Sequence, residues 1–232
     1  MSPEPRQLHI PVPEGPVSSV SALFDDPGPG RKPHALLLAH GAGAPMTHPF
    51  MEGMAAALAE RGHAVLRFQY PYAEVMAQTE RRRPPDPMRV LEGAHGAAHL
   101  ALRDLLPDLP QVFLGKSMGG RVASHLCAAG LPAVGLCFLG YPLHPAGKPG
   151  VLRDEHFVDL LQPALFLQGT RDKLADLDLL RAALERYAGE ATLEVVHQAN
   201  HGFQVPVASG RTAADVQADL ADRIDAWLAD LA

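Results

Sequence analysis

A Gly-Lys-Ser-Met-Gly motif at residues 115–119 carries the first side chain of this chain that could do chemistry. An apolar, strand-like run precedes the motif and a helix-compatible segment follows it. In this context the two glycines allow a strained strand-to-helix turn that lifts a serine hydroxyl above the sheet, because glycine alone tolerates such close backbone approach. The motif predicts Ser117 as a nucleophile, with Gly115 and Gly119 as the residues that permit its turn.

A serine hydroxyl becomes a useful nucleophile only when a base takes its proton and an acid orients that base. Asp172 follows an apolar run at residues 164–168, and His201 follows another at residues 192–196. Both positions lie beyond the expected carboxyl ends of strands, where open parallel sheets place their sites. We predict Asp172 as the acid and His201 as the base. His197 is the weaker candidate, because it still belongs to its strand and is interpreted as a packed or surface histidine.

An early His-Gly-Ala-Gly loop could stabilise the negative charge that acyl transfer places on a carbonyl oxygen. Backbone N–H groups usually supply this stabilisation, one from the residue after the nucleophile and one from a glycine-rich loop after an early strand. These residues are predicted to be Met118 and Ala42, with Gly41 and Gly43 making the loop flexible. A nucleotide-binding loop is the weaker alternative, because Met46 stands where the dinucleotide motif needs its last glycine.

Alternating strand and helix patterns must position these residues. Strands are expected near residues 34–40, 63–70, 111–116, 134–140, 164–169 and 192–197, after an early edge strand at 17–24. Helices are expected near residues 49–61, 87–106, 118–129, 174–188 and 212–231. The alternation predicts an α/β fold with a mainly parallel sheet of about seven strands and helices on both faces.

Two helices carry start signals. Asp86 and Pro87 fit the cap and first position of the helix near 87–106. Thr212 and Asp215 have the spacing of a capping box for the last helix. These signals predict where the two helices begin.

Two histidines on the helix near 87–106 raise the question of a metal site. His95 and His99 lie four residues apart and could face one ion, with Glu92 nearby. The zinc-protease pattern needs a glutamate directly after the first histidine, and Gly96 occupies that place. We therefore interpret both as exposed helix histidines and predict no metal.

The chain's motifs together resemble the α/β-hydrolase superfamily over nearly its whole length. The motifs that carry the resemblance lie at residues 40–43, 115–120, 169–172 and 200–203. Within this superfamily, the chain is similar to dienelactone-hydrolase-like proteins. Residues 141–149 resemble the branch of testis-expressed and non-specific-lethal-subunit-3-like hydrolases. The resemblance implies an α/β-hydrolase fold with hydrolase activity.

Large lids in this superfamily are inserted after the strand that here ends near Gly140. The link at residues 141–162 is short, so we expect no large cap domain. A small or open pocket follows, bounded by this link and by a loop at residues 71–86. Polar side chains of the link that could meet a polar substrate group are His144, Lys148, Arg153 and His156. Ordinary loop polarity is the favoured interpretation of each of them taken singly.

Other positive charges near the predicted site have two interpretations each. Arg81–Arg83 precedes two prolines and is interpreted as a solvated loop, with a positive rim that favours acidic substrates as the alternative. Lys116 stands next to the nucleophile. It could pair with a carboxylate or add positive potential to the site.

The composition predicts one globular domain over residues 1–232. Hydrophobic residues make up 47% of the chain, which excludes a disordered protein. The net charge of −6 argues against a nucleic-acid partner. Cys127 and Cys137 are expected as reduced core residues. Neither a signal peptide nor a membrane-length apolar run is present, so we expect no membrane partner and a cytoplasmic monomer or homodimer.

Two functions of different classes fit these observations. The first is a serine hydrolase that cleaves small carboxylic esters or thioesters through an acyl-enzyme and needs no cofactor. Dienelactone hydrolases proper use a cysteine where this chain has Ser117, so their substrate does not carry over. The second is an interaction or scaffold module with little turnover, a role that some eukaryotic relatives of this branch have. A complete set of nucleophile, acid, base and oxyanion loop favours the enzyme, because a scaffold has no physical need for all of them.

Overall fold

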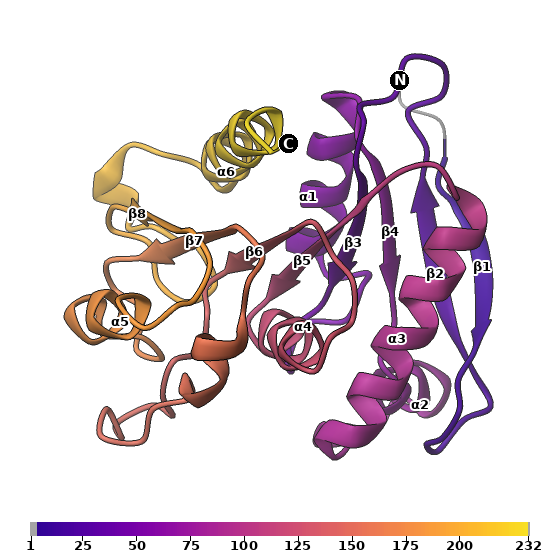
Figure 1. Cartoon of the computed structure of the whole chain (residues 1–232), viewed down its shortest axis with the longest axis horizontal. Helices are drawn as coiled ribbons and strands as arrows, with labels where there is room; N and C mark the ends of the chain where they lie inside the picture. The colour runs from indigo at the N-terminus through magenta and orange to yellow at the C-terminus, as the bar shows by residue number, and fades with distance from the viewer. Residues whose placement is uncertain (1–3, 232) are drawn as a thin grey trace.

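The computed structural model describes residues 4–231 and is built on one eight-stranded sheet (Figure 1). The strands are β1 (Arg6–Pro11), β2 (Ser19–Asp25), β3 (Ala35–Ala39), β4 (Ala64–Phe68), β5 (Gln111–Lys116), β6 (Gly135–Leu139), β7 (Ala164–Gly169) and β8 (Ala191–Val196). Their order is β1-β2-β4-β3-β5-β6-β7-β8. In this order, all neighbours from β4 onward are parallel. Strand β2 pairs antiparallel with β1 on one side and with β4 on the other. This arrangement confirms the predicted α/β-hydrolase fold class.

Helices cover both faces of the sheet. They are α1 (Pro49–Glu60), α2 (Pro71–Thr79), α3 (Met88–Leu105), α4 (Met118–Ala128), α5 (Leu177–Leu184) and α6 (Ala213–Ala229), with short 3₁₀ turns at Glu155–Asp159 and Val207–Ser209. In Figure 1, α1 and α6 lie together on one face and the other four helices lie on the opposite face. Within residues 4–231, no helix combines the length and apolar character needed to cross a membrane.

The apolar runs become central strands because both of their faces are covered. Every residue of β3 and of β5 is buried, as expected for parallel strands between two helical layers. One layer of the core packs under α2 to α5 and the other under α1 and α6. Cys127 lies in the first layer and Cys137 in the second, and both are buried free thiols, as predicted.

The register of the sheet brings distant loops to one edge. The last residue of β3 lies opposite Gly115 near the end of β5, and the last residue of β7 lies opposite the last residue of β8. The loops that follow these four strands therefore leave the sheet at the same edge, where the predicted site residues stand.

Two elements differ from the sequence-based expectation. The strand predicted at 17–24 as an edge is β2, which is internal because β1 pairs with it on its outer side. The segment 71–86, predicted as a loop, begins with helix α2, which has Pro71 at its first position. Proline is favoured there because it lacks the N–H that a first turn leaves unsatisfied.

The predicted helix starts have different outcomes. Thr212 and Asp215 form the full capping box of α6, as predicted. Helix α3 instead begins at Met88 with Pro87 as its cap, so Asp86 is not the capping residue. The Asp86 carboxylate accepts a hydrogen bond of 3.0 Å from Arg83 Nη2.

The interpretation of His95 and His99 as exposed residues is wrong. Both rings are buried edge-on against Phe113. His95 Nδ1 lies 3.2 Å from the Tyr70 hydroxyl, and His99 Nδ1 lies 2.8 Å from Gln111 Oε1. Burial lowers the pKa of His95 to about 3, so this ring is neutral near pH 7. In the described part of the chain, no group of three or more histidine, cysteine, aspartate or glutamate residues could hold a metal ion.

Candidate active site

Ser117 occupies a sharp turn between the end of β5 and the start of α4. Its backbone has φ of 51° and ψ of −114°, a conformation that is strained for a residue with a side chain. A Cβ atom on Gly115 would lie 2.1 Å from the amide nitrogen of Gly120, and one on Gly119 would lie 2.5 Å from the carbonyl oxygen of Ala39. Both glycines are therefore required for the close packing of this turn against the sheet.

The structure brings Ser117, His201 and Asp172 together in one chain of hydrogen bonds. Ser117 Oγ lies 2.8 Å from His201 Nε2, and His201 Nδ1 lies 2.7 Å from Asp172 Oδ2. The three residues come from the loops that follow β5, β8 and β7. This is the geometry in which an imidazole can take a serine proton while a carboxylate fixes its tautomer. His197, the weaker candidate, is exposed.

Asp172 is held by donors that the sequence analysis did not identify. Its side chain is fully buried. Gln168 Nε2 donates to Oδ2 at 2.6 Å and the Leu174 N–H donates to Oδ1 at 2.8 Å, in addition to the His201 contact. Gln168 also accepts from the Tyr141 N–H at 2.9 Å through Oε1. A polar residue inside the otherwise apolar run of β7 was the signal that could have revealed this role.

Lys116 binds the histidine loop through its ammonium group. Nζ donates to the carbonyl oxygen of His201 at 2.7 Å and lies 5.5 Å from the centroid of the Phe203 ring. Burial lowers the pKa of Lys116 to about 8, and the nearby charge of Asp172 opposes this shift. The direct partner of the ammonium is thus a backbone oxygen next to the imidazole, and the carboxylate acts on it only through its charge.

Buried rings hold the loop that follows β3. His40 Nδ1 lies 2.8 Å from the Gly41 carbonyl oxygen, and the Tyr70 N–H donates to His40 Nε2 at 3.0 Å. Burial lowers the pKa of His40 to about 4, so the ring is neutral and donates through Nδ1–H. The Tyr72 hydroxyl contacts the carbonyl oxygens of Gly41 and Ala42 at 3.2 and 3.0 Å. These contacts hold the backbone of the loop in place beside Ser117.

The two predicted oxyanion donors lie at the same cavity as the nucleophile. Ala42 and Met118 both line it beside Ser117. Met118 is the first residue of α4, so its N–H has no acceptor within the helix. Gly41 and Gly43 flank Ala42 in the loop after β3.

The cavity at Ser117 has a volume of about 480 Å³, which suits a small organic molecule. Residues from the link after β6 and from the segment before α3 form its walls, as predicted from the length of the link. Its lining residues are Ala42, Pro85, Asp86, Met88, Leu91, Ser117, Met118, Arg121, Pro142, Pro145, Arg153 and Leu174. Arg153 is the polar link residue that reaches the cavity, whereas His144 is buried and accepts from the Asp176 N–H at 3.0 Å. Arg81–Arg83 is exposed and outside the lining.

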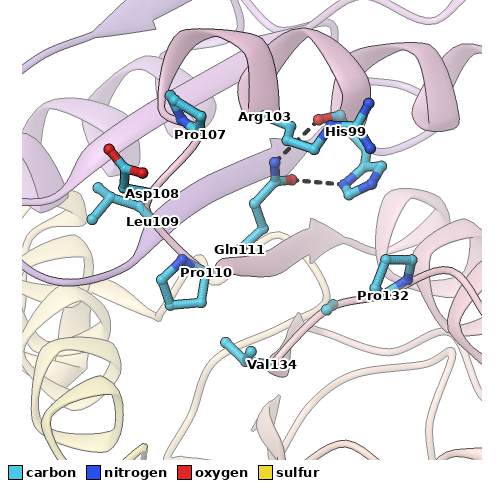
Figure 2. A pocket seen from close by; sticks show the side chains of 10 residues that line it. His99, Arg103, Pro107, Asp108, Leu109, Pro110, Gln111, Pro132 and Val134 are labelled. Atoms are coloured by element: carbon cyan, nitrogen blue, oxygen red, sulfur yellow. Dashed lines mark hydrogen bonds between the residues drawn. The ribbon is translucent and has the colours of Figure 1, made fainter.

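A second cavity lies at the opposite edge of the sheet and has a volume of about 310 Å³. Figure 2 shows that prolines and the hydrogen-bonded pair His99 and Gln111 line it. Gln111 also donates to the His99 carbonyl oxygen at 3.1 Å. The lining contains no serine, cysteine or threonine. This cavity therefore lacks the nucleophile that the cavity at Ser117 has.

Comparisons with known proteins agree with this fold. Dienelactone hydrolase from Anabaena variabilis is 20% identical, with 99% of each chain covered and a TM-score of 0.73. A serine hydrolase without lid from Xanthomonas campestris is 22% identical, with 98% of this chain and 96% of that chain covered and a TM-score of 0.70. An esterase from Pyrococcus furiosus is 15% identical, with 98% and 91% covered and a TM-score of 0.76. A family model described as an alpha/beta hydrolase domain matches residues 32–229, and the chain therefore belongs to the alpha/beta hydrolase family.

Proposed function

We propose that this protein is a serine hydrolase that cleaves small carboxylic esters or thioesters. The observation that carries the proposal is the continuous hydrogen-bonded chain from Ser117 through His201 to the buried Asp172, at the wall of a cavity. The structural neighbours include an esterase and a serine hydrolase, which supports the same reaction class. In this proposal Ser117 is the nucleophile, His201 the base and Asp172 the orienting acid.

The acylation step follows from the positions of these atoms. Ser117 Oγ attacks the substrate carbonyl carbon while its proton moves to His201 Nε2, 2.8 Å away. The carbonyl oxygen gains negative charge and accepts hydrogen bonds from the N–H groups of Ala42 and Met118. The imidazolium then gives its proton to the leaving alcohol or thiol as the tetrahedral intermediate collapses to an acyl-serine. Asp172 keeps the ring in the tautomer that has its lone pair on Nε2.

Deacylation repeats these steps with water. His201 takes a proton from the water as its oxygen attacks the acyl carbon, and the proton returns to Ser117 Oγ when the acid leaves. No external group has to accept or supply electrons. The lysine contact to the His201 carbonyl supports the reaction by holding the imidazole loop in place.

Turnover of short 4-nitrophenyl esters tests the proposal. Acetate and butyrate esters should be hydrolysed by the wild-type protein, and Ser117→Ala should reduce kcat/KM to near the rate in buffer. Ser124→Ala is a matched control, because Ser124 is a buried serine of α4 whose hydroxyl bonds to the Arg121 carbonyl oxygen. Hydrolysis that survives in Ser117→Ala, or a folded wild-type protein that turns over no ester or thioester of a varied panel, would refute the proposal.

A further inference from the structure

Two arginines line the cavity at Ser117 without an ion-pair partner. Arg121 and Arg153 both belong to its wall, and neither forms a salt bridge within residues 4–231. Most other described arginines bond to a carboxylate, for example Arg61 to Asp222 and Arg223 to Asp219. The two guanidinium groups therefore bring positive charge to the cavity that the protein does not neutralise by direct pairing.

The N–H groups of these guanidinium groups are almost unused. A guanidinium has five N–H donors. Within the described residues, no guanidinium N–H of Arg121 finds an acceptor, and its Nε atom is buried. Arg153 makes a single long contact, from Nη1 to the Pro142 carbonyl oxygen at 3.4 Å. Arginine in a partly buried wall normally satisfies more of its donors than this, which points to an acceptor that the chain itself does not supply.

The backbones that carry both arginines are fixed. Arg121 lies in α4, where its N–H donates to the Ser117 carbonyl oxygen at 3.2 Å. Arg153 lies in the link after β6, where its N–H donates to the Leu143 carbonyl oxygen at 2.8 Å and its own carbonyl oxygen accepts from the Tyr141 hydroxyl at 2.7 Å. The charged groups are thus attached to elements that also position the nucleophile and the cavity wall.

Titratable neighbours respond to the positive charge of Arg121. Burial lowers the pKa of Arg153, and the charge of Arg121 lowers it further, so the two guanidinium groups repel each other. Burial lowers the pKa of His156 to about 4, and the charges of His125 and Arg121 contribute to this shift. An anion placed between the two arginines would relieve this repulsion.

One carboxylate lines the same cavity and leaves the arginines free. Asp86 Oδ1 accepts from Arg83 Nη2, and neither Arg121 nor Arg153 is bonded to it. With the charges of Asp86 and Arg83 compensating each other, the cavity keeps the two positive charges of its arginines. Its remaining lining is mainly apolar, with proline, leucine and methionine side chains.

We propose that Arg121 and Arg153 form an anionic subsite that binds a carboxylate carried by the ester or thioester substrate. The proposal rests on the proposed function and adds the substrate class: monoesters of short dicarboxylic acids, or esters whose alcohol portion bears a carboxylate. Guanidinium groups match carboxylates through charge-assisted and often bidentate hydrogen bonds. Because both arginines share the cavity with Ser117, a bound carboxylate would also orient the scissile carbonyl.

A matched pair of substrates tests this assignment. 4-Nitrophenyl hemiglutarate and 4-nitrophenyl valerate have acyl chains of equal length, and only the first carries a carboxylate. The wild-type protein should have the higher kcat/KM for the hemiglutarate. Arg121→Met and Arg153→Met should each lower the hemiglutarate-to-valerate ratio by about 10- to 100-fold, as expected for hydrogen bonds to a charged group. 4-Butyryloxybenzoate, with its carboxylate on the alcohol portion, shows which part of the substrate the subsite binds.

Controls separate the charge effect from general damage. Arg103→Met removes an exposed arginine of α3 that lies at the other cavity, and it should leave the ratio unchanged. Arg121→Lys keeps the charge and loses the planar group, so its ratio should fall between those of wild type and Arg121→Met. A ratio that both Arg→Met variants leave within about twofold of wild type, for both positions of the carboxylate, overturns the subsite.

Binding of free glutarate tests the subsite without any turnover. Calorimetry on the Ser117→Ala protein should detect glutarate binding that weakens by about 10- to 100-fold when Arg121→Met or Arg153→Met is added. If the wild-type protein hydrolyses neither ester, the proposed function fails, and this titration still decides the subsite. Absence of glutarate binding to Ser117→Ala, or binding that neither Arg→Met substitution weakens, would refute it.

Discussion

The two edges of the central sheet each hold a hydrogen-bonded histidine, but the two histidines have different partners and different exposure. His99 at the amino-terminal edge and His201 at the carboxyl-terminal edge each have a hydrogen-bonded side-chain partner. His99 itself lines the cavity at its edge, whereas the cavity at the other edge is lined by Ser117, which His201 contacts. His99 belongs to a helix, is 5% exposed and contacts an amide. His201 belongs to a loop, has a side chain 27% exposed, and stands between a hydroxyl and a carboxylate. His201 therefore has on its two nitrogens the groups that the proposed acyl transfer needs, and His99 lacks them although it is more deeply buried.

Among the changes that test this difference between the edges, removal of the base is expected to have the largest effect on kcat. His201→Ala leaves the Ser117 hydroxyl without a proton acceptor, so kcat should fall by about 10⁵- to 10⁶-fold. Steady-state kinetics with a 4-nitrophenyl ester measures the loss. His197→Ala is the matched control, because His197 is exposed on the same loop side of β8, and its kcat/KM should stay within twofold of wild type. Equal losses in the two variants would contradict the assignment of His201.

Loss of the acid's charge is expected to have the next largest effect. Asp172→Asn keeps the shape of the side chain but favours the wrong tautomer of His201, so kcat should fall by about 10⁴-fold. Asp176→Asn is the control, because Asp176 caps α5 through its side-chain oxygen and asparagine caps equally well. A decrease of less than tenfold in Asp172→Asn would show that the carboxylate does not orient the base.

Removal of the lysine contact is expected to have a smaller effect on catalysis. Lys116→Met deletes the donor to the His201 carbonyl oxygen and loosens the loop, so kcat/KM should fall by about tenfold, in line with one lost hydrogen bond from a charged group. Lys116→Arg retains a donor and should recover part of the loss. A Lys116→Met enzyme with wild-type kinetics would show that the contact does not position the histidine.

The same lysine predicts a specific dependence of stability on pH. Burial lowers its pKa to about 8 in the folded protein, whereas the unfolded chain keeps a value near 10.5. Between these pH values the unfolded chain holds a proton that the folded chain has lost, so the free energy of unfolding rises with pH. Relative to Lys116→Met, the wild-type protein should gain on the order of 3 kcal/mol from pH 8 to pH 10.5. Urea unfolding at several pH values measures this gain, and a constant difference would contradict the prediction.

A substitution at the amino-terminal edge should lower the stability of the protein and leave its activity unchanged. His99→Leu leaves the Gln111 amide oxygen buried without its donor and should lower the free energy of unfolding by about 1–3 kcal/mol. Adding Gln111→Leu should restore part of that loss, because both polar partners are then removed. The kcat/KM of His99→Leu should stay within twofold of wild type. A large catalytic loss here would break the contrast between the two edges.

That the three candidate residues come together could be predicted from the sequence more readily than their surroundings, for a physical reason. Ser117, Asp172 and His201 each follow an apolar strand, and parallel strands end at one edge, so local patterns were enough to place them together. The roles of Gln168 and Lys116 depend on partners far away in the chain, which no local pattern reveals. The glycine pair around Ser117 could be predicted because the turn leaves no room for a Cβ atom.

The misplaced elements share a different cause. Strand β1 is a short edge strand, and four of its six residues are exposed, so it lacks the continuous apolar signal of the central strands. The burial of His95 and His99 depends on Phe113 and Tyr70, which come from other elements. The helical spacing says nothing about residues of other elements, so the polarity of the two histidines alone led to the prediction that they are exposed.

Covalent labelling tests the central claim most directly. A fluorophosphonate reacts only with a serine whose proton an adjacent base can take, and intact mass spectrometry counts the adducts per chain. The account predicts one adduct on the wild-type protein, located at Ser117 by peptide mapping, and none on Ser117→Ala. A folded wild-type protein that remains unlabelled, or an adduct that persists in Ser117→Ala, would contradict it.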